Sequence, residues 1–264
     1  MIVDMTARSP GELLAQPPGE RFLLGRQVWG FGGVHGGLSL ALLTAAMSGE
    51  VPGAVPRSVT GRFHRPITGE FTVSASTVRA GRSISTLAAG ATSPQGVHVE
   101  ATGVFSSVPQ GTFTPIAPEP PVVPDPADCD RVPILTEYVP IGDHVEVRSA
   151  DGNQPLAGGP RPDLTAWVRF TEDDEAPDSL RLICLIDALP PSFYSMVDRM
   201  YLVPTVELAI HLAGGRGAGS PWVLLRARSR ALDSSGLLDE WVDAWGADGT
   251  YLGSAHQLRL VREV

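Results

Sequence analysis

The chain has 264 residues and a net charge of −9, from 20 basic and 29 acidic side chains. Hydrophobic residues make up 43% and charged residues 19%, which is enough apolar material for a buried core and too little charge for a disordered chain. The acidic balance argues against a nucleic-acid binder, because such proteins usually carry a basic field. Every basic side chain apart from histidine is arginine, so a P-loop lysine and a lysine that anchors pyridoxal phosphate are excluded.

The hydropathy pattern predicts neither a membrane span nor a secretion signal. The longest apolar stretches, Leu38–Met47 and Leu180–Leu189, are well short of the roughly 20 apolar residues that a membrane helix needs. The first residues contain no basic segment followed by an apolar run, so we expect no signal peptide. Two cysteines, Cys129 and Cys184, are too few for a disulfide framework or a four-cysteine metal site. We therefore expect a cytoplasmic protein that contacts no membrane.

The N-terminal part of the chain predicts one apolar helix followed by antiparallel strands. Residues 36–47 are rich in alanine and leucine on all sides, which is typical of a buried helix. β-Branched residues and an alternation of apolar and polar side chains predict strands over residues 57–66, 71–80, 82–92 and 97–108.

A proline-rich connector divides the chain. Seven prolines fall between Pro109 and Pro126. Because proline lacks a backbone donor and fixes φ, this segment can form neither a helix nor a central strand. We predict an N-terminal domain over residues 1–108, an extended connector over 109–130 and a C-terminal domain over 131–264.

The C-terminal part repeats the plan of the N-terminal part. It predicts a helix over residues 179–197, broken at Pro190-Pro191, and strands over 204–213, 221–232, 237–247 and 250–261. A gap-free superposition of the two parts places Gly96 on Gly249 in matching turns. The repeat therefore predicts the duplication of a small α+β unit, in which one long helix is wrapped by an antiparallel sheet.

This repeated unit resembles the hotdog fold in its double-hotdog form. The segments that carry the resemblance are His35-Gly36-Gly37, Val78–Ser83, Leu185–Ala188, Pro204–His211 and Ser254–Gln257. Together, and in this order over nearly the whole chain, they resemble the type II acyl-CoA thioesterases. The resemblance implies hydrolysis of an acyl-CoA without a metal or redox cofactor, and association into a homo-oligomer.

The resemblance also implies a set of catalytic residues. In the family, an Asp, a Thr and a Gln hold and activate the water that attacks the thioester. They map onto Asp187, Thr205 and Gln257 of this chain. The chain departs from the family pattern after the threonine, where Glu207-Leu208 stands in place of Asp-His.

The two parts of the repeat differ in the residues that they offer to such a site. The positions of the first part that match Thr205 and Gln257 are Ser58 and Val104, and the position that matches Asp187 falls near the glycines at 36 and 37. The polar set is therefore complete only in the second part. We predict one active site per chain, built from both parts.

Two further expectations concern the chemistry of Asp187 and of the first helix. Burial disfavours a charged carboxyl, so we expect the pKa of Asp187 to be raised towards the range of a useful general base. We expect the backbone N–H groups of Gly37 and Leu38 to bind the oxyanion at the helix N-terminus, with Gly36 allowing the substrate to approach closely. His35 either contacts the substrate or caps the helix.

Alternative interpretations stay open at this point. A hotdog hydratase or dehydratase would use an Asp/His pair, for which His35 and His256 are available, and a non-catalytic acyl-CoA or lipid-binding protein would keep the fold alone. Asp187 could instead be a solvent-exposed helix residue. Any contact with CoA phosphates must come from individual arginines, with Arg79, Arg82, Arg226 and Arg228 as candidates.

Overall fold

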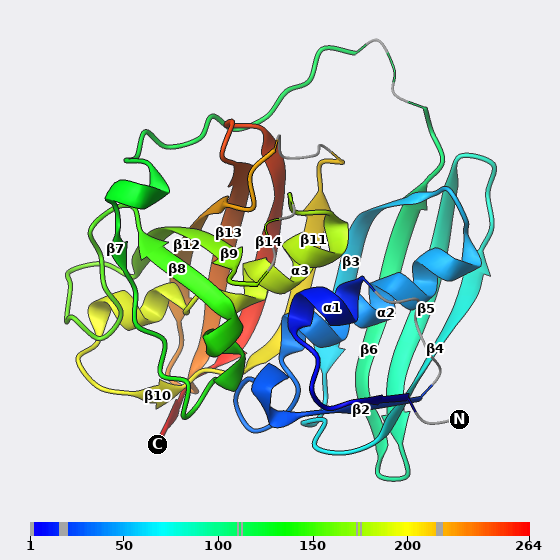
Figure 1. Cartoon of the computed structure of the whole chain (residues 1–264), viewed down its shortest axis with the longest axis horizontal. Coiled ribbons are helices and arrows are strands. Elements are labelled where there is room, and N and C mark those ends of the chain that lie inside the picture. Colours follow the sequence, from blue (N-terminus) through cyan, green and yellow to red (C-terminus); the bar gives the residue numbers. More distant parts are fainter. Residues whose placement is uncertain are drawn as a thin grey trace.

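The computed structural model describes residues 3–15, 21–109, 111, 113–172, 174, 176–214 and 219–264. Two halves lie side by side, and each has one main helix packed against a curved, mostly antiparallel sheet (Figure 1). The α+β class and the repeated helix-and-sheet unit are therefore as predicted from the sequence.

The first half is built around α2 (Gly36–Glu50). Its main strands are β3 (Val55–Phe63), β4 (Phe71–Arg79), β5 (Ile84–Ser93) and β6 (Gly96–Ser106). Four short elements precede α2, namely β1 (Val3–Met5), α1 (Pro10–Leu14), β2 (Arg21–Leu24) and the 3₁₀ helix η1 (Arg26–Val28). Apolar side chains on all sides of α2 are buried, as its composition predicted, because strands β3 to β6 wrap one side and α3 of the second half covers another.

The second half is built around α3 (Ser179–Ala188). Its main strands are β8 (Val145–Ser149), β9 (Asp163–Phe170), β11 (Thr205–Leu212), β12 (Val223–Leu232), β13 (Leu237–Gly246) and β14 (Tyr251–Leu260). The short elements are η2 (Pro126–Asp128), β7 (Asp130–Arg131), η3 (Pro140–His144), η4 (Ser192–Met196), β10 (Tyr201–Leu202) and β15 (Arg262–Glu263). α3 begins at the Asp178 N-cap and ends before Pro190-Pro191, so the predicted break is confirmed.

The two halves share one continuous sheet. Its strand order is β1-β2-β4-β5-β6-β3-β11-β14-β13-β12-β9-β8-β7, and the antiparallel pair β3–β11 joins the halves. Val59 and Ile210 face each other across this junction, and both are fully buried. The helices α2 and α3 also contact each other, and the start of α2 at Gly36 and Gly37 lies against the end of α3 at Asp187.

The segment between β6 and η2 crosses from one half to the other, and its described residues form no helix or strand. Two buried tryptophans hold its second part against the sheet, since Trp245 Nε1 donates to the Pro118 carbonyl at 3.0 Å and Trp167 Nε1 to the Pro124 carbonyl at 2.9 Å. Residues 110 and 112 lie outside the described part of the chain, and the predicted domain boundaries stay predictions. Among the described residues, no helix combines the length and the apolar character that crossing a membrane would need.

Candidate active site

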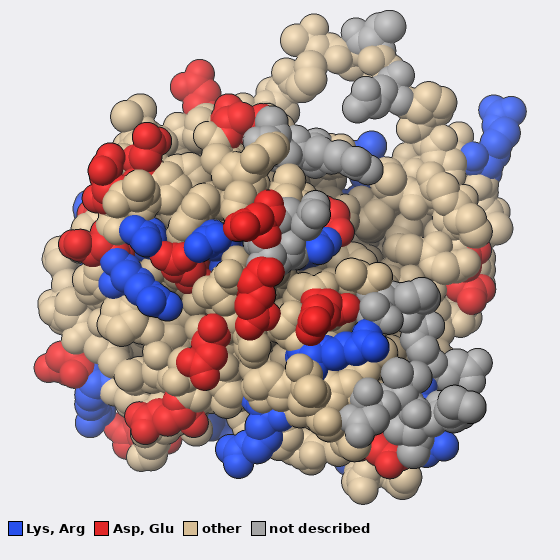
Figure 2. Space-filling view, in the orientation of Figure 1, with Lys and Arg blue, Asp and Glu red and all other residues tan. Residues whose placement is uncertain are grey.

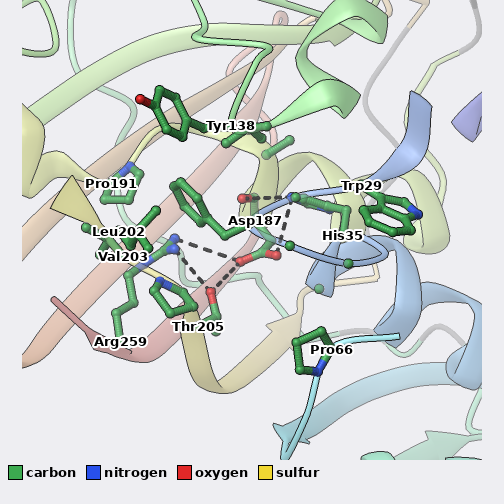
Figure 3. A pocket seen from close by; sticks show the side chains of 18 of the residues that line it. Trp29, His35, Pro66, Tyr138, Asp187, Pro191, Leu202, Val203, Thr205 and Arg259 are labelled. Atoms are coloured by element: carbon green, nitrogen blue, oxygen red, sulfur yellow. Dashed lines mark hydrogen bonds and ion pairs between the residues drawn. The ribbon is translucent and has the colours of Figure 1, made fainter. Parts of the chain in front are cut away.

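Asp187 lies in the last turn of α3, at the boundary between the two halves. It is 8% exposed, and it forms part of the wall of a cavity of about 710 Å³. The alternative that Asp187 is a solvent-exposed helix residue is therefore wrong. Figure 3 shows its carboxylate surrounded by His35, the N-cap residue of α2, by Thr205 of β11 and by Arg259 of β14.

The two glycines at the start of α2 make room for this carboxylate. The Gly37 N–H donates to Asp187 Oδ2 at 2.7 Å. A Cβ atom at Gly37 would lie 2.7 Å from Asp187 Cβ, and one at Gly36 would lie 2.9 Å from Asp187 Oδ2. Both distances are too short for real contacts, so glycine at these positions is what lets α2 and α3 approach each other.

Thr205 and Gln257 hold the other carboxylate oxygen. Thr205 lies at the start of β11 and Gln257 lies on the neighbouring β14. The Thr205 hydroxyl donates to Asp187 Oδ1 at 3.0 Å, and Gln257 Nε2 donates to the same oxygen at 3.2 Å. Gln257 is fully buried behind Asp187, and its Oε1 has no hydrogen-bond partner among the described residues. The structure thus brings together the three residues that the family resemblance implied.

His35 both caps α2 and contacts Asp187. Its Nδ1 accepts the Leu38 N–H at 3.4 Å, while its Nε2 lies 3.3 Å from the Asp187 carbonyl oxygen and 3.5 Å from Oδ2. An Nδ1 that accepts and an Nε2 that donates describe the neutral ring protonated at Nε2. Burial lowers the pKa of His35 and outweighs the opposing effect of the Asp187 charge, in agreement with a neutral ring.

The environment of Asp187 favours the ionised carboxylate. Burial alone would raise its pKa, but the neighbouring His35 and Arg259, together with hydrogen bonds from Gly37 and Thr205, hold the pKa below its usual range. The guanidinium and the hydrogen bonds from Gly37 and Thr205 act on the carboxylate whatever the protonation state of His35. The sequence-based expectation of a raised pKa is therefore wrong, since it counted burial and not the donors that other elements bring.

The structure also corrects the expected oxyanion donors. The Gly37 N–H donates to Asp187, and the Leu38 N–H donates to His35. The Leu38 side chain is fully buried. Gly36 is the member of this turn that lines the cavity, and its N–H has no hydrogen-bond acceptor among the described residues. Neither expected amide donor is therefore available, and the α2 amide that faces the cavity is that of Gly36, which was expected only to let the substrate approach closely.

Two charged residues of the site were missed by the sequence reasoning. Arg259 is 4% exposed and lines the cavity, with its Nη1 donating to Thr205 Oγ1 at 3.1 Å. Its Nε donates at 2.8 Å to Glu240 on β13, which is 1% exposed. Strand alternation offered a signal for Arg259, because a residue two positions after Gln257 faces the same side of the sheet.

Glu207, at the position where the chain departs from the family pattern, lies at the seam between the halves. Its carboxylate pairs with Arg62 Nε on β3 at 2.8 Å, while the neighbouring Leu208 is fully buried. Neither residue lines the cavity. The departure therefore falls on a contact between β3 and β11 and not on the cavity wall.

The cavity is mostly apolar around this polar centre. Aromatic and aliphatic side chains come from both halves, among them Trp29, Phe63, Ile67, Tyr138, Leu189, Tyr194 and Leu202. Its arginines are the buried Arg259 and the exposed Arg26, Arg65 and Arg262. None of the four arginines that the sequence analysis offered for CoA lines it, and Arg226 instead pairs with Asp243 at 3.4 Å.

Charged side chains of both signs are interspersed over the face drawn in Figure 2, without a continuous basic area. Within the described residues, no cluster of three or more His, Cys, Asp or Glu side chains could hold a metal ion.

Comparisons with known proteins identify both halves. A family model described as the acyl-CoA thioesterase N-terminal domain matches residues 26–106, and one described as the C-terminal domain matches residues 117–261. No curated protein sequence matches the chain.

Solved structures show the same fold over the whole chain. A hotdog-fold protein of unknown function from Alicyclobacillus acidocaldarius is 22% identical, covers 97% of this chain and 98% of its own, and superposes with a TM-score of 0.85. A putative thioesterase II from Thermobifida fusca is 25% identical, with 91% of each chain covered and a TM-score of 0.79. The acyl-CoA thioesterase II TesB2 from Mycobacterium marinum is 17% identical. The match covers 97% of this chain and 99% of the other, with a TM-score of 0.73. These likenesses confirm the double-hotdog fold.

Proposed function

Because the chain belongs to the type II acyl-CoA thioesterase family, we propose that it hydrolyses an acyl-CoA to the free acid and CoA, with Asp187 as the general base. One observation carries this proposal. A buried carboxylate, held by donors from α2, β11 and β14, lines an apolar cavity between the halves. Its lowered pKa supports the role, because the base is ionised and ready at neutral pH.

The hydrogen bonds of Asp187 leave room for the attacking water. A carboxylate offers about four acceptor positions, and Gly37, Thr205 and Gln257 occupy three of them. The remaining position, on Oδ2, is where the water is held. Asp187 takes the proton of this water as its oxygen attacks the thioester carbon, and the proton passes to the sulfur as the tetrahedral intermediate expels CoA. Thr205 and Gln257 fix the carboxylate, and no covalent enzyme intermediate is needed.

The two parts of the substrate meet different surfaces in this proposal. The acyl group lies in the apolar interior of the cavity, where burial of each methylene favours binding by roughly 0.8 kcal/mol. The CoA phosphates lie at the rim, where the exposed Arg26, Arg65 and Arg262 supply positive charge beside the cavity. The predicted homo-oligomer and cytoplasmic location stay predictions.

The direct test is thiol release from a panel of acyl-CoAs that runs from short to long and from straight to branched acyl groups. We expect release of CoA from at least one member, at a rate that rises as the acyl group fills the cavity. A wild-type protein that binds acyl-CoA but releases no thiol across the panel would contradict hydrolysis and support the non-catalytic binding protein.

One observation favours a second candidate function. His35 Nε2 lies 3.5 Å from Asp187 Oδ2, and both residues line the cavity. This is the Asp/His pair that a hydratase or dehydratase acting on acyl thioesters would use. Loss of the enoyl absorbance of crotonyl-CoA without thiol release would favour this reaction, and thiol release without loss of the double bond would favour hydrolysis.

A further inference from the structure

We propose that Arg259 is a catalytic residue that binds the carbonyl oxygen of the substrate and stabilises the oxyanion, and that Glu240 is the positioning residue that holds it. This inference rests on the proposed function. It starts from a role that the helix amides fill only in part, because the N–H groups of Gly37 and Leu38 point to Asp187 and His35 and leave the Gly36 N–H alone facing the cavity.

The position of Arg259 fits this role. Its guanidinium lies beside Asp187 and Thr205 at the cavity wall (Figure 3). Nη2 lies 3.8 Å from Asp187 Oδ1, beyond hydrogen-bond distance, and donates to no described residue. An arginine has five N–H donors, and the bonds to Glu240 and Thr205 use two of them. Donors on Nη2 are therefore available for an oxygen in the cavity, next to the base that delivers the water.

Glu240 keeps the guanidinium in place from behind. Its Oε2 accepts the Arg259 Nε–H, and its Oε1 accepts both the N–H and the hydroxyl of Ser192, each at 2.6 Å. Ser192 starts η4, just after the Pro190-Pro191 break. The buried carboxylate is thus satisfied on both oxygens, and it fixes Arg259 before any substrate arrives. Donors that are already oriented stabilise developing charge without a cost of reorganisation.

The surrounding charges also define what Arg259 would bind. Asp187 and Glu240 flank the guanidinium with two carboxylates, so its charge is already compensated. A carboxylate on the acyl chain would be repelled by Asp187 and Glu240, whereas a neutral carbonyl gains a strong hydrogen-bond donor. During attack of water on the thioester carbon, the carbonyl π electrons move to the oxygen, and this oxyanion forms against Nη2. When the C–S bond breaks, the electrons return to the carbonyl and the thiolate takes the proton from Asp187.

The experiment compares Arg259→Met with Arg259→Lys, with Glu240→Gln, and with Arg228→Met as the matched control for loss of an exposed arginine on β12. We expect Arg259→Met to lower kcat by at least about 100-fold and to raise KM by about tenfold, because the guanidinium binds the neutral carbonyl and, more strongly, the oxyanion. Arg259→Lys should recover part of the loss, and Glu240→Gln should lower kcat by about tenfold. The deficit of Arg259→Met should persist over the whole pH range. A deficit that disappears at high pH would overturn the proposal, because it would mean that Arg259 acts only by keeping Asp187 ionised.

A binding experiment separates this inference from the proposed function. Two non-hydrolysable probes are used, an S-(2-oxoalkyl)-CoA, which has a carbonyl oxygen, and the matching S-alkyl-CoA, which has none. Arg259→Met should weaken binding of the ketone probe by at least about tenfold and leave the affinity for the thioether probe unchanged. An equal effect on both probes, or on neither, would contradict the role of Arg259 even if the wild type hydrolyses acyl-CoA. If Arg259→Met leaves Glu240 unpaired and unfolds the protein, the double variant Glu240→Gln/Arg259→Met removes both charges and gives the same comparison.

Discussion

The carboxylate of Asp187, at the end of the helix of the second half, accepts the backbone N–H of Gly37, at the start of the helix of the first half. The distance is 2.7 Å, and the bond is possible because neither Gly36 nor Gly37 has a side chain. The catalytic carboxylate that we propose is therefore oriented by the other half of the duplicated fold. Neither half alone could form this site.

The first prediction concerns this contact. Gly37→Ala adds a Cβ that would lie 2.7 Å from Asp187 Cβ and 3.0 Å from the Cys184 carbonyl oxygen, so the two helices must move apart. We expect a loss of about 1–3 kcal/mol in the free energy of unfolding, together with a loss of activity. Gly49→Ala is the matched control, since it lies in the same helix and its Cβ would meet nothing within 4 Å. It should stabilise the protein by roughly 0.5–1 kcal/mol. Chemical denaturation of both variants checks the pair, and equal effects would contradict the packing argument.

The hydroxyl of Thr205 is the subject of the second prediction. Thr205→Val keeps the shape of the side chain but removes a donor to Asp187 and an acceptor for Arg259. We expect kcat/KM to fall by about 10–100-fold, which is the size of a lost hydrogen bond to a charged group. Thr205→Ser keeps the hydroxyl and should stay within a few-fold of the wild type. If serine is as damaging as valine, the hydroxyl is not what the site needs from this position.

The pH dependence of hydrolysis follows from the direction in which the pKa of Asp187 is shifted. The base is active when ionised, and its pKa is held below its usual value, so activity should stay level from neutral pH down to the ordinary range of aspartic acid, about 3.9. It should fall only below that. The measurement is kcat/KM against pH on one acyl-CoA, corrected for acid unfolding. An acid limb near pH 6 would show that burial dominates over the guanidinium and the hydrogen bonds.

A separate prediction concerns stability and His35. Burial lowers its pKa in the folded state, so below about pH 6.5 the unfolded chain binds a proton that the folded chain does not. Stability is therefore complete above that pH and declines as the pH falls from 6.5 towards the folded pKa, by at most about 1.4 kcal/mol per pH unit from this group. Urea denaturation at pH 7.5 and at pH 5.5 measures the fall in the free energy of unfolding between the two pH values. This fall should be smaller in His35→Gln than in the wild type. If the free energy of unfolding falls equally with pH in the variant and in the wild type, a buried neutral ring is contradicted.

Much of the fold was predictable because its signals are local. The apolar sequence of residues 36–47 predicted the buried helix α2, and the paired prolines at 190 and 191 predicted where α3 ends. The match of Gly96 to Gly249 placed two equivalent turns, and both glycines adopt positive φ angles. The register that joins β3 to β11 was not predictable in this way, because it depends on contacts between distant parts of the chain.

The site was only partly predictable. The resemblance to a family supplied Asp187, Thr205 and Gln257, and the structure places their polar groups within hydrogen-bond distance. The direction of the Asp187 pKa could not be read from α3 alone, because Gly37 and Arg259, which help to set it, come from α2 and β14. Arg259 was not predicted, because its burial and its pairing with Glu240 depend on how β14 packs beside β13.

The measurement that tests the central claim most directly is kcat/KM for thiol release by the wild type and by Asp187→Asn, with matched folding checked by circular dichroism. The asparagine keeps the volume of the side chain but cannot take a proton from water. We predict a loss of about 10²–10⁴-fold, the usual contribution of a general base, with acyl-CoA binding retained. An Asp187→Asn variant that hydrolyses acyl-CoA at the wild-type rate would contradict the assignment of Asp187 as the base.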